Sequence, residues 1–405
     1  MSFRISEYFR GVGVKRLSPV EIEPNDSNQH EFNGTAGFKG FFGTEKRRFQ
    51  GRFIYMSDED SEPIQADGNL TWYDARKRDP VRTEFRLYYT NNVVIEKAAA
   101  GDLLVIGWVS ENKLLIIVAA AGSTLEQQLL WLFKLDQVQS KFTFEDFSTD
   151  RRELGFAGKY ILSELGIEAE EQAPDYLTEL LKRYRDTFPT TREFSDYSRS
   201  TVEGVDPLAD PDTALMTWLN REEMLFKALE RVIVKKRLQK GFGKDNSDVD
   251  EFIAFSLSVQ NRRKARAGFS FEHNLVYLFS LHKLKFSRGA VTERNNKPDF
   301  IFPGINYYHN ADFDVNLLTM LGVKTTAKDR WRQILAEAAK IPVKHLITLE
   351  PAISRNQTED MRANNLHLII PAPLINTYTT GQRKDIIDVR SFIRILKDRQ
   401  KYLNK

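Results

Sequence analysis

The chain has 405 residues, which is too long for one ordinary domain and favours two or three. Its hydrophobic fraction of 41% and aromatic fraction of 12% suffice for folded cores and exclude a disordered chain. The formal net charge of +3 is too small to indicate a class of partner. The absence of cysteine excludes zinc sites built on thiolates and favours a reducing compartment. Because no apolar run resembles a signal peptide or a membrane span, we expect a cytoplasmic protein.

The first part of the chain, 1–165, has the pattern of β-strands. Aromatic and β-branched residues alternate with polar ones in several short segments, and turn residues separate these segments. One helix is expected at 123–135, where apolar residues recur at helical spacing. Together these elements predict a β-barrel or β-sandwich core with one helix. The expected strands are 47–56, 69–75, 82–91 and 102–110.

The segment 166–213 differs in composition from both of its neighbours. It is acidic at first, has a helical pattern at 176–188, and then becomes rich in Pro, Asp, Ser and Thr with little periodicity. Such a composition is typical of exposed connections between domains. We therefore expect a linker region that contains one helix.

The last part, 214–405, alternates helical and strand patterns. A long helix is expected to end at Gly241, a second one covers 248–268, and a third begins near Ser270. Alternating strands and helices indicate an α/β or α+β core. Short apolar strands are expected at 297–303, 318–326, 344–350 and 366–372, and a helix closes the chain.

Four charged residues of this last part follow one another in the order that a metal-dependent nuclease needs. Glu272 lies near the start of the third helix, and Asp299 begins a short apolar strand. Lys324 lies on the next strand, and Glu337 lies on the helix that follows it. Phosphodiester hydrolysis needs a cation that polarises the phosphate, and magnesium prefers carboxylate oxygens. A nearby lysine can offset the charge of the transition state. We expect all four to be catalytic, with Asp299 and Glu337 as the Mg²⁺ ligands.

One position departs from the usual nuclease pattern. A second carboxylate commonly lies two residues before the lysine, where this chain has Gly322. Glu337 can supply it, because it lies beside the buried helical stripe that includes Trp331 and Ile334. Taken singly, a Pro-Asp turn, a lysine that ends a strand and a glutamate on a helix all fit structural roles. The nuclease hypothesis therefore depends on the ordered set.

Several longer motifs add a resemblance to this pattern. From Gly241 to about Leu349 the chain resembles the catalytic domain of EcoRII-type restriction endonucleases. The resemblance implies an α/β domain of the restriction-endonuclease-like, PD-(D/E)xK fold, a homodimer, and Mg²⁺-dependent cleavage of double-stranded DNA. By position, Asp299, Lys324 and Glu337 match the catalytic residues of the family, and Glu272 matches its helix carboxylate. The motifs are KGFG (240–243), VDEFIA (249–254), NRRKARAG (261–268), KPDFIFP (297–303) and above all VKTTAKDRWRQIL (323–335).

The resemblance also implies residues that recognise bases. Lys328, Asp329 and Arg330 match the short motif with which this family recognises CC and GG. Arginine or lysine can donate to guanine O6 and N7, and a carboxylate can accept from cytosine N4. Tyr308 and His309 lie in a matching region, but a tyrosine nucleophile does not fit beside a complete metal site. These two residues are therefore expected to have supporting roles at most.

One feature of the family is missing from its expected place. Family members that recognise CCWGG extrude the central base pair and stack it on side chains near the start of this domain. The corresponding segment here, 221–224, contains no aromatic residue, and the nearby Phe226 fits a core position equally well. Base extrusion, the bases between CC and GG, and the cleavage position stay open.

The first part of the chain carries clusters of basic and aromatic residues that suit phosphate contacts. It resembles, more loosely, the effector domain of the same family through KRLS (15–18), the glycine-rich segment 30–43 and RTEFRLYY (82–89). The resemblance implies a B3-like pseudobarrel over 1–165 that binds a further DNA copy and covers the catalytic cleft until it does so. The expected effector DNA-binding residues are Lys15, Arg16, Arg76, Lys77, Arg78, Arg82 and Arg86.

Three functions are compatible with this sequence. The leading one is a type II restriction endonuclease that acts on a CCWGG-like palindrome, together with a cognate methyltransferase that does not form a complex with it. Homodimerisation is expected, because a palindromic site mirrors a two-fold axis. The second is a sequence-specific DNA-binding regulator whose nuclease core is inactive. The third is a nuclease that depends on cytosine methylation through its first domain.

Overall fold

The computed structural model describes residues 4–22, 30–60, 62–79, 81–168, 174–185 and 187–404. The chain divides into two compact units, each of which is described by itself. The N-terminal unit comprises Ser2–Ala169 and Pro351–Gln357, and the C-terminal unit comprises Glu170–Glu350 and Thr358–Lys405. Among the helices in the described ranges, none combines the length and apolar character that a bilayer crossing requires.

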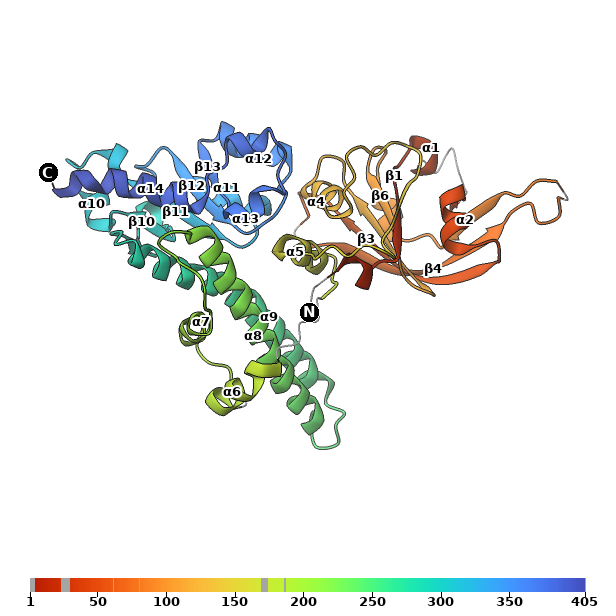
Figure 1. Ribbon diagram of the computed structural model, residues 1–405, viewed down its shortest axis with the longest axis horizontal. Coiled ribbons are helices and arrows are strands. Elements are labelled where there is room, and N and C mark those ends of the chain that lie inside the picture. The colour runs from red at the N-terminus through yellow and green to blue at the C-terminus, as the bar shows by residue number, and fades with distance from the viewer. Residues whose placement is uncertain are drawn as a thin grey trace. The chain divides into compact units, whose positions relative to one another are not determined.

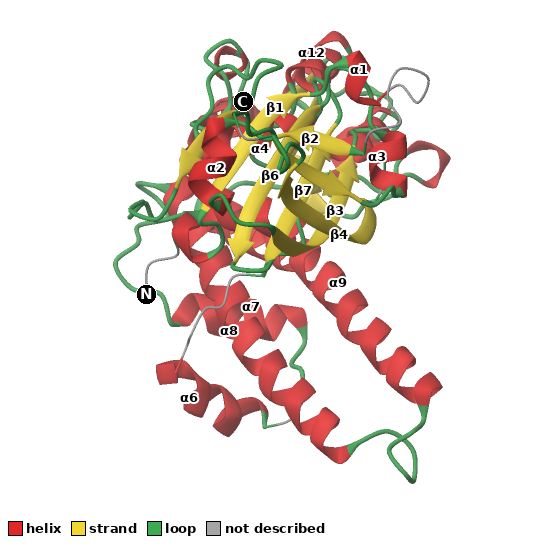
Figure 2. Ribbon diagram, turned by 90° about the vertical axis from the view of Figure 1, so that its right-hand side faces the viewer, coloured by secondary structure: helices red, strands yellow, loops and turns green. Residues whose placement is uncertain are grey.

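The N-terminal unit is built on one sheet whose strands run in the order β2-β5-β4-β3-β7-β6-β1-β8. All neighbouring strands are antiparallel except β3 and β7, which are parallel. Figure 2 shows β1, β6, β7, β3 and β4 side by side. The strands are β1 Gly11–Arg16, β2 Glu31–Asn33, β3 Arg47–Met56, β4 Ile64–Asp74, β5 Phe85–Tyr89, β6 Leu103–Ser110, β7 Lys113–Ala119 and β8 Thr143–Asp146. The helices are α1 Pro19–Ile22, α2 Ala36–Phe42, α3 Val93–Lys97, α4 Thr124–Phe133 and α5 Phe156–Glu164, with a 3₁₀ turn at Ile5–Glu7.

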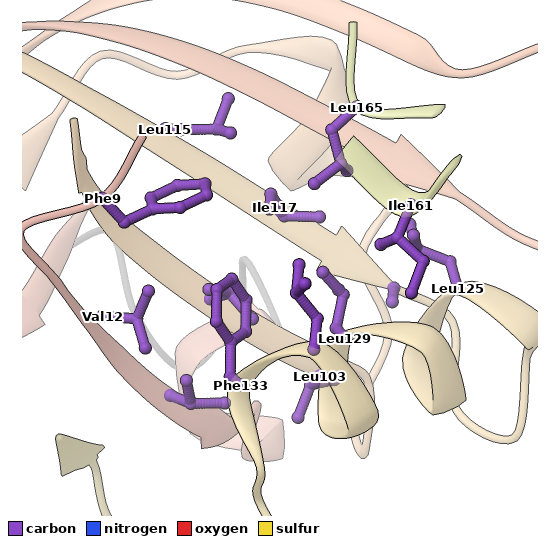
Figure 3. Close-up of a cluster of buried hydrophobic side chains, with 14 of the residues drawn as sticks. Phe9, Val12, Leu103, Leu115, Ile117, Leu125, Leu129, Phe133, Ile161 and Leu165 are labelled. Carbon is purple, nitrogen blue, oxygen red and sulfur yellow. The ribbon is translucent and has the colours of Figure 1, made fainter. Parts of the chain in front are cut away.

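Both faces of the central strands are buried, which explains why β6 and β7 are almost continuously apolar. One face carries Ile117 and packs against Leu129 and Phe133 of α4 (Figure 3). The other face carries Ile116 and belongs to the cluster that includes Phe38 of α2. Each large apolar side chain buried in this way stabilises the unit by about 1.5–3 kcal/mol. The two clusters therefore form a core on each side of one sheet.

The C-terminal unit contains a second, mixed sheet of order β13-β12-β11-β10-β9. Its strands β11, β12 and β13 are parallel, whereas β10 pairs antiparallel with β11 and β9. This agrees with the expected alternation of strands and helices. The strands are β9 Ser287–Arg288, β10 Phe300–Phe302, β11 Thr319–Lys324, β12 Lys344–Thr348 and β13 Leu366–Ile369. The helices of the chain from here on are α6 Pro174–Tyr184, α7 Thr191–Ser200, α8 Pro211–Lys240, α9 Val249–Leu281, α10 Ile305–His309, α11 Trp331–Leu335, α12 Arg355–Ala363, α13 Ala372–Ile375 and α14 Val389–Gln400. Short 3₁₀ turns lie at Glu293–Asn295, Val315–Leu317, Lys328–Arg330, Gln382–Lys384 and Lys401–Asn404.

Helix α9 corrects the expectation of two separate helices at 248–268 and from Ser270. It runs without interruption from Val249 to Leu281 and lies beside α8 (Figure 1). Gly268 lies in its middle, and a Cβ added there would meet nothing within 4 Å. A glycine inside a helix costs about 1 kcal/mol, and the packing of the residues after it, such as Phe271 and Leu275, offsets this cost.

In its described residues, the expected linker, 166–213, holds the two helices α6 and α7 rather than one. The second, α7, begins with a capping box in which Thr190 and Glu193 bond to each other's backbone. Its Phe194 packs with Leu180 of α6 and Leu225 of α8 in one buried cluster. The polar composition of this segment therefore reflects a cap and one exposed face, and α6 and α7 are part of the C-terminal unit.

Candidate active site

The structure brings Asp299 and Lys324 to the same end of two neighbouring strands. Asp299 directly precedes β10, and Lys324 is the last residue of β11. The two strands are antiparallel, with Phe300 opposite Leu321, so the start of one lies beside the end of the other. The backbone N–H of Val323 donates to Asp299 Oδ2 at 2.6 Å. This bond fixes the Asp299 carboxylate next to Lys324.

Glu337 lies in a turn and not on a helix, which corrects the expectation from its sequence pattern. Helix α11 ends at Leu335, because Ala338 adopts a left-handed backbone conformation with φ of 47°. The ammonium of Lys344 donates to the carbonyl oxygens of Glu337 and Ala338 at 2.5 and 2.6 Å. A buried lysine from β12 therefore holds the turn that presents the Glu337 carboxylate.

The packing of α11 explains why the usual second carboxylate is absent. A Cβ placed on Gly322 would lie 2.5 Å from Cδ1 of Ile334, a contact that real Cβ atoms essentially never make. Ile334 itself is fully buried. A larger side chain at position 322 would force the end of the Ile334 side chain to move, and the sequence offers Glu337 as the other candidate carboxylate.

The surroundings of Glu337 disfavour the ionised form of its carboxylate. Burial raises the pKa of Glu337 to about 7, the nearby Asp299 also raises it, and Lys324 and Lys344 oppose the shift. Its Oε2 atom is buried and has no hydrogen-bond partner among the described residues. A buried oxygen without a hydrogen-bond partner destabilises the folded protein unless a ligand supplies the missing interaction.

Asp299 and Glu272 belong to the same cluster. Burial raises the pKa of Asp299, the Val323 N–H and Lys324 lower it, and Glu272 raises it again. Glu272 lies in the last third of α9 and accepts from Arg288 at 2.6 and 3.0 Å. Arg288 is opposite Phe300 in the β9–β10 pair, so it also lies beside Asp299. All four residues predicted to be catalytic therefore interact within one site.

The chemistry of these donors fits a magnesium ion. Asp299 and Glu337 are hard oxygen donors with raised pKa values, the charge of Asp299 contributes to the shift of Glu337, and a divalent cation would neutralise both. Within the part of the chain that the structure describes, no group of three or more His, Cys, Asp or Glu side chains is arranged for a metal. Magnesium commonly uses one or two carboxylates together with water and phosphate oxygens, so two carboxylates are sufficient.

The segment expected to recognise bases directly precedes α11. Lys328–Arg330 forms a 3₁₀ turn in which Lys328 has a positive φ of 31°. Arg330 is exposed, whereas the side chain of Asp329 lies outside the described part of the structure. The backbone N–H groups of Ala327 and Lys328 both donate to Glu350. The turn is thus attached to the end of β12.

Tyr308 is buried, and its hydroxyl is held by hydrogen bonds. It is 2% exposed, and its hydroxyl donates to the Glu293 carboxylate at 2.6 and 2.7 Å. Burial and Glu293 raise the pKa of Tyr308 to about 12, which opposes its use as a nucleophile. The hydroxyl also accepts from the backbone N–H of Lys340, close to the turn that carries Glu337. This contact gives Tyr308 a supporting position, and the neighbouring His309 is exposed.

Sequence reasoning missed the charged residues that hold this site together, namely Arg288, Glu293, Lys344 and Glu350. Lys344 and Glu350 flank the apolar strand KHLITLE, and both are buried. A charge at a buried strand position needs a partner, so their presence at the ends of a core strand was the available signal. Their partners lie on other elements and leave no local pattern.

The structure separates the expected effector residues of the N-terminal unit into two groups. Lys15 is buried and donates to both carboxylate oxygens of Glu21, at 2.6 and 2.7 Å. Four of the residues expected to contact DNA are in ion pairs: Lys15 with Glu21, Arg16 with Glu126, Arg76 with Glu84, and Arg86 with Glu31 and Glu84. The other three, Lys77, Arg78 and Arg82, are exposed and lie, like the exposed Arg76, in the connection between β4 and β5.

Comparison with known proteins agrees with the resemblance for the C-terminal part. Residues 226–393 match the family model described as EcoRII C terminal. The type II restriction enzyme EcoRII of Escherichia coli is 43% identical over 207 residues, which are 51% of this chain and 50% of that protein. The chain thus spans about half the length of this curated relative.

Two solved structures align with lower similarity. Metal-depleted Ecl18kI in complex with uncleaved, modified DNA aligns with a TM-score of 0.46 and 17% identity, over 58% of this chain and 87% of that one. The complex of the restriction endonuclease PspGI with substrate DNA aligns with a TM-score of 0.40 and 16% identity, over 54% and 94%. Residues 226–393 of this chain are therefore similar in sequence to the EcoRII C-terminal family, and the match to the whole relative extends over about half of each protein.

Proposed function

We propose that this chain is a type II restriction endonuclease that hydrolyses double-stranded DNA with Mg²⁺ at a palindrome containing CC and GG. The observation that carries the proposal is the convergence of Asp299, Lys324 and Glu337 in one site with raised carboxyl pKa values. Perturbed carboxylates beside a lysine are typical of functional sites. The mixed sheet and the sequence relationship support a restriction-endonuclease-like fold for the catalytic domain.

Each residue has a role in this proposal. Asp299 and Glu337 would hold Mg²⁺, which polarises the phosphate and lowers the pKa of the attacking water when it is bound. Lys324 places its positive charge where negative charge develops on the phosphate. Glu272, held by Arg288, keeps additional negative charge close to Asp299 and so favours cation binding. Lys328, Asp329 and Arg330 would contact the CC and GG bases from the major groove.

The first test is cleavage of mixed plasmid DNA in Mg²⁺, followed by sequencing of the ends. We expect cuts at one CC- and GG-containing motif, and a loss of about 10²- to 10³-fold or more in Lys324→Ala. Lys285→Ala is the matched control, because Lys285 is an exposed lysine outside the cluster. Specific binding without cleavage, on methylated and unmethylated DNA, would favour the regulator. Cleavage of methylated DNA alone would favour the methylation-dependent nuclease.

For the N-terminal unit we propose that it binds a further DNA copy and restrains the nuclease, and that the enzyme acts as a homodimer. The exposed Lys77, Arg78 and Arg82 support DNA binding, whereas the restraint and the B3-like fold are inferred from the resemblance to the family.

A fragment without the N-terminal unit tests the restraint. If it began near Pro189, it would lack α6, whose Leu180 belongs to the core of the C-terminal unit. A fragment that begins at Pro174 keeps this helix. We expect it to cleave a single-site substrate faster than the whole chain, and an equal or slower rate, with native circular dichroism, contradicts the restraint.

A further inference from the structure

A buried carboxylate at the end of β12 holds the backbone of the segment proposed to recognise bases. Glu350 is 1% exposed. Its Oε2 atom accepts from the backbone N–H of Ala327 at 2.5 Å and from that of Lys328 at 3.1 Å. Hydrogen bonds to an ionised acceptor are roughly twice as strong as neutral ones. Glu350 therefore binds two successive peptide groups where the 3₁₀ turn Lys328–Arg330 begins.

The turn needs support of this kind. Lys328 has a φ of 31°, a conformation that residues with a Cβ seldom adopt and that persists only where the surroundings impose it. The same strand end makes a second attachment, since the buried Thr348 donates from Oγ1 to the carbonyl oxygen of Thr325 at 3.3 Å. Glu350 is itself fixed, because Tyr378 donates from its hydroxyl to the Glu350 carbonyl oxygen at 2.6 Å.

From this geometry we infer that Glu350 is a positioning residue for sequence specificity: it sets the backbone from which Lys328, Asp329 and Arg330 reach the bases. The inference rests on the proposed function. Recognition of a base edge by two hydrogen bonds depends on the alignment of the side chain, and a misplaced backbone loses that alignment. Glu350 does not touch the reacting atoms, so its loss should affect the choice of site more than the chemical step.

Three substitutions separate this role from general stability. Glu350→Gln keeps an acceptor oxygen of the same reach, Glu350→Asp keeps the charge but is one methylene shorter, and Glu350→Leu removes the acceptor. The matched control is Glu230→Leu, because Glu230 is 2% exposed, is paired with Arg263 at 2.6 Å, and lies on α8. This control removes an equally buried carboxylate from another place in the same unit.

The measurement is the ratio of kcat/KM on the cognate site to kcat/KM on sites with one substituted base. We expect Glu350→Leu and Glu350→Asp to lower this ratio by about tenfold or more, and Glu350→Gln to stay within about threefold of the wild type. Glu230→Leu should lose thermal stability and keep the ratio. An unchanged ratio in Glu350→Asp, or in a folded Glu350→Leu, overturns the inference.

A second readout does not depend on the nuclease activity. Amide hydrogen exchange at Ala327 and Lys328 should be slow in the wild type and in Glu350→Gln, and faster in Glu350→Asp and Glu350→Leu. If the wild type shows no site preference, the proposed function fails, whereas the exchange rates still decide whether Glu350 holds the turn. Equal exchange in all variants would overturn the positioning role even if cleavage is site-specific.

Discussion

Two clusters of buried charge, one in each unit of the chain, differ in how their charges are paired. In the N-terminal unit, the buried Lys15 contacts both oxygens of Glu21, and Arg16 is paired with Glu126. In the C-terminal unit, burial raises the pKa of Asp299 and of Glu337, Asp299 raises that of Glu337 further, and Glu337 Oε2 has no partner within the described residues. Paired charges hold a fold in one arrangement, whereas unpaired like charges leave a site that a cation and a phosphate can complete. The pairing of their charges, more than their positions in the sequence, therefore separates these two clusters.

The largest effect that would sharpen this comparison is expected from neutralising Asp299 or Glu337. Glu337→Gln and Asp299→Asn should each lower the single-turnover cleavage rate by about 10³-fold or more, since several kcal/mol of transition-state stabilisation are lost. The melting temperature without metal should stay equal or rise, because the repulsion between two buried carboxylates is removed. Stopped-time cleavage assays and differential scanning fluorimetry measure the two quantities. A variant that cleaves at the wild-type rate would remove its residue from the site.

A smaller effect, on stability rather than on cleavage, is expected from breaking the buried ion pair between Lys15 and Glu21. Lys15→Met should lower the free energy of unfolding by about 3 kcal/mol, because it leaves the largely buried Glu21 carboxylate without its counterion. Cleavage at saturating Mg²⁺ should change little as long as the protein is folded. Urea unfolding gives the stability, and the exposed Lys77→Ala, expected within about 0.5 kcal/mol of the wild type, is the control. Equal stability of both variants would mean that the pair is dispensable.

A third expected effect is a pH dependence of stability. The folded chain raises the pKa of Glu337 from 4.5 to about 7, so it favours the protonated carboxyl more than the unfolded chain does. This contribution to stability is fully present below about pH 4.5 and is lost as the pH rises to about 7. The stability of the wild type relative to Glu337→Gln should therefore decline across this range in metal-free buffer and stay constant above it. Thermal unfolding at several pH values tests this, and Mg²⁺ should flatten the decline, because it binds the ionised form. A rising difference would contradict the raised pKa.

Local patterns predicted the strands better than the way they pair. The apolar patterns at 47–56 and 102–110 correspond to β3 and β6, because the residues of a strand themselves indicate which side chains are buried. The parallel pairing of β3 with β7 joins residues more distant in the chain, and no local pattern specifies it. The predicted helix end at Gly268 was wrong for a similar reason, because the tertiary packing of the residues after it allows a glycine inside α9.

The candidate site was predictable as a set of residues and not as a geometry. Asp299 and Lys324 followed from their places at the ends of neighbouring strands. Glu337 was predicted as part of the site, but its predicted place on a helix was wrong, because Ala338 turns the backbone after α11. The residues that hold the site, such as Lys344 and Glu350, make their contacts with backbone groups of other elements. Such contacts depend on the tertiary structure and leave no spacing in the sequence.

The close contact between Gly322 and Ile334 has a consequence for the evolution of this site. A glutamate introduced at position 322 alone would collide with a fully buried side chain, and a smaller residue at 334 alone would leave a cavity beneath α11. A carboxylate at the usual position would therefore be accommodated best together with a smaller residue at 334. Packing at this contact, independently of catalytic chemistry, thus disfavours a carboxylate at position 322.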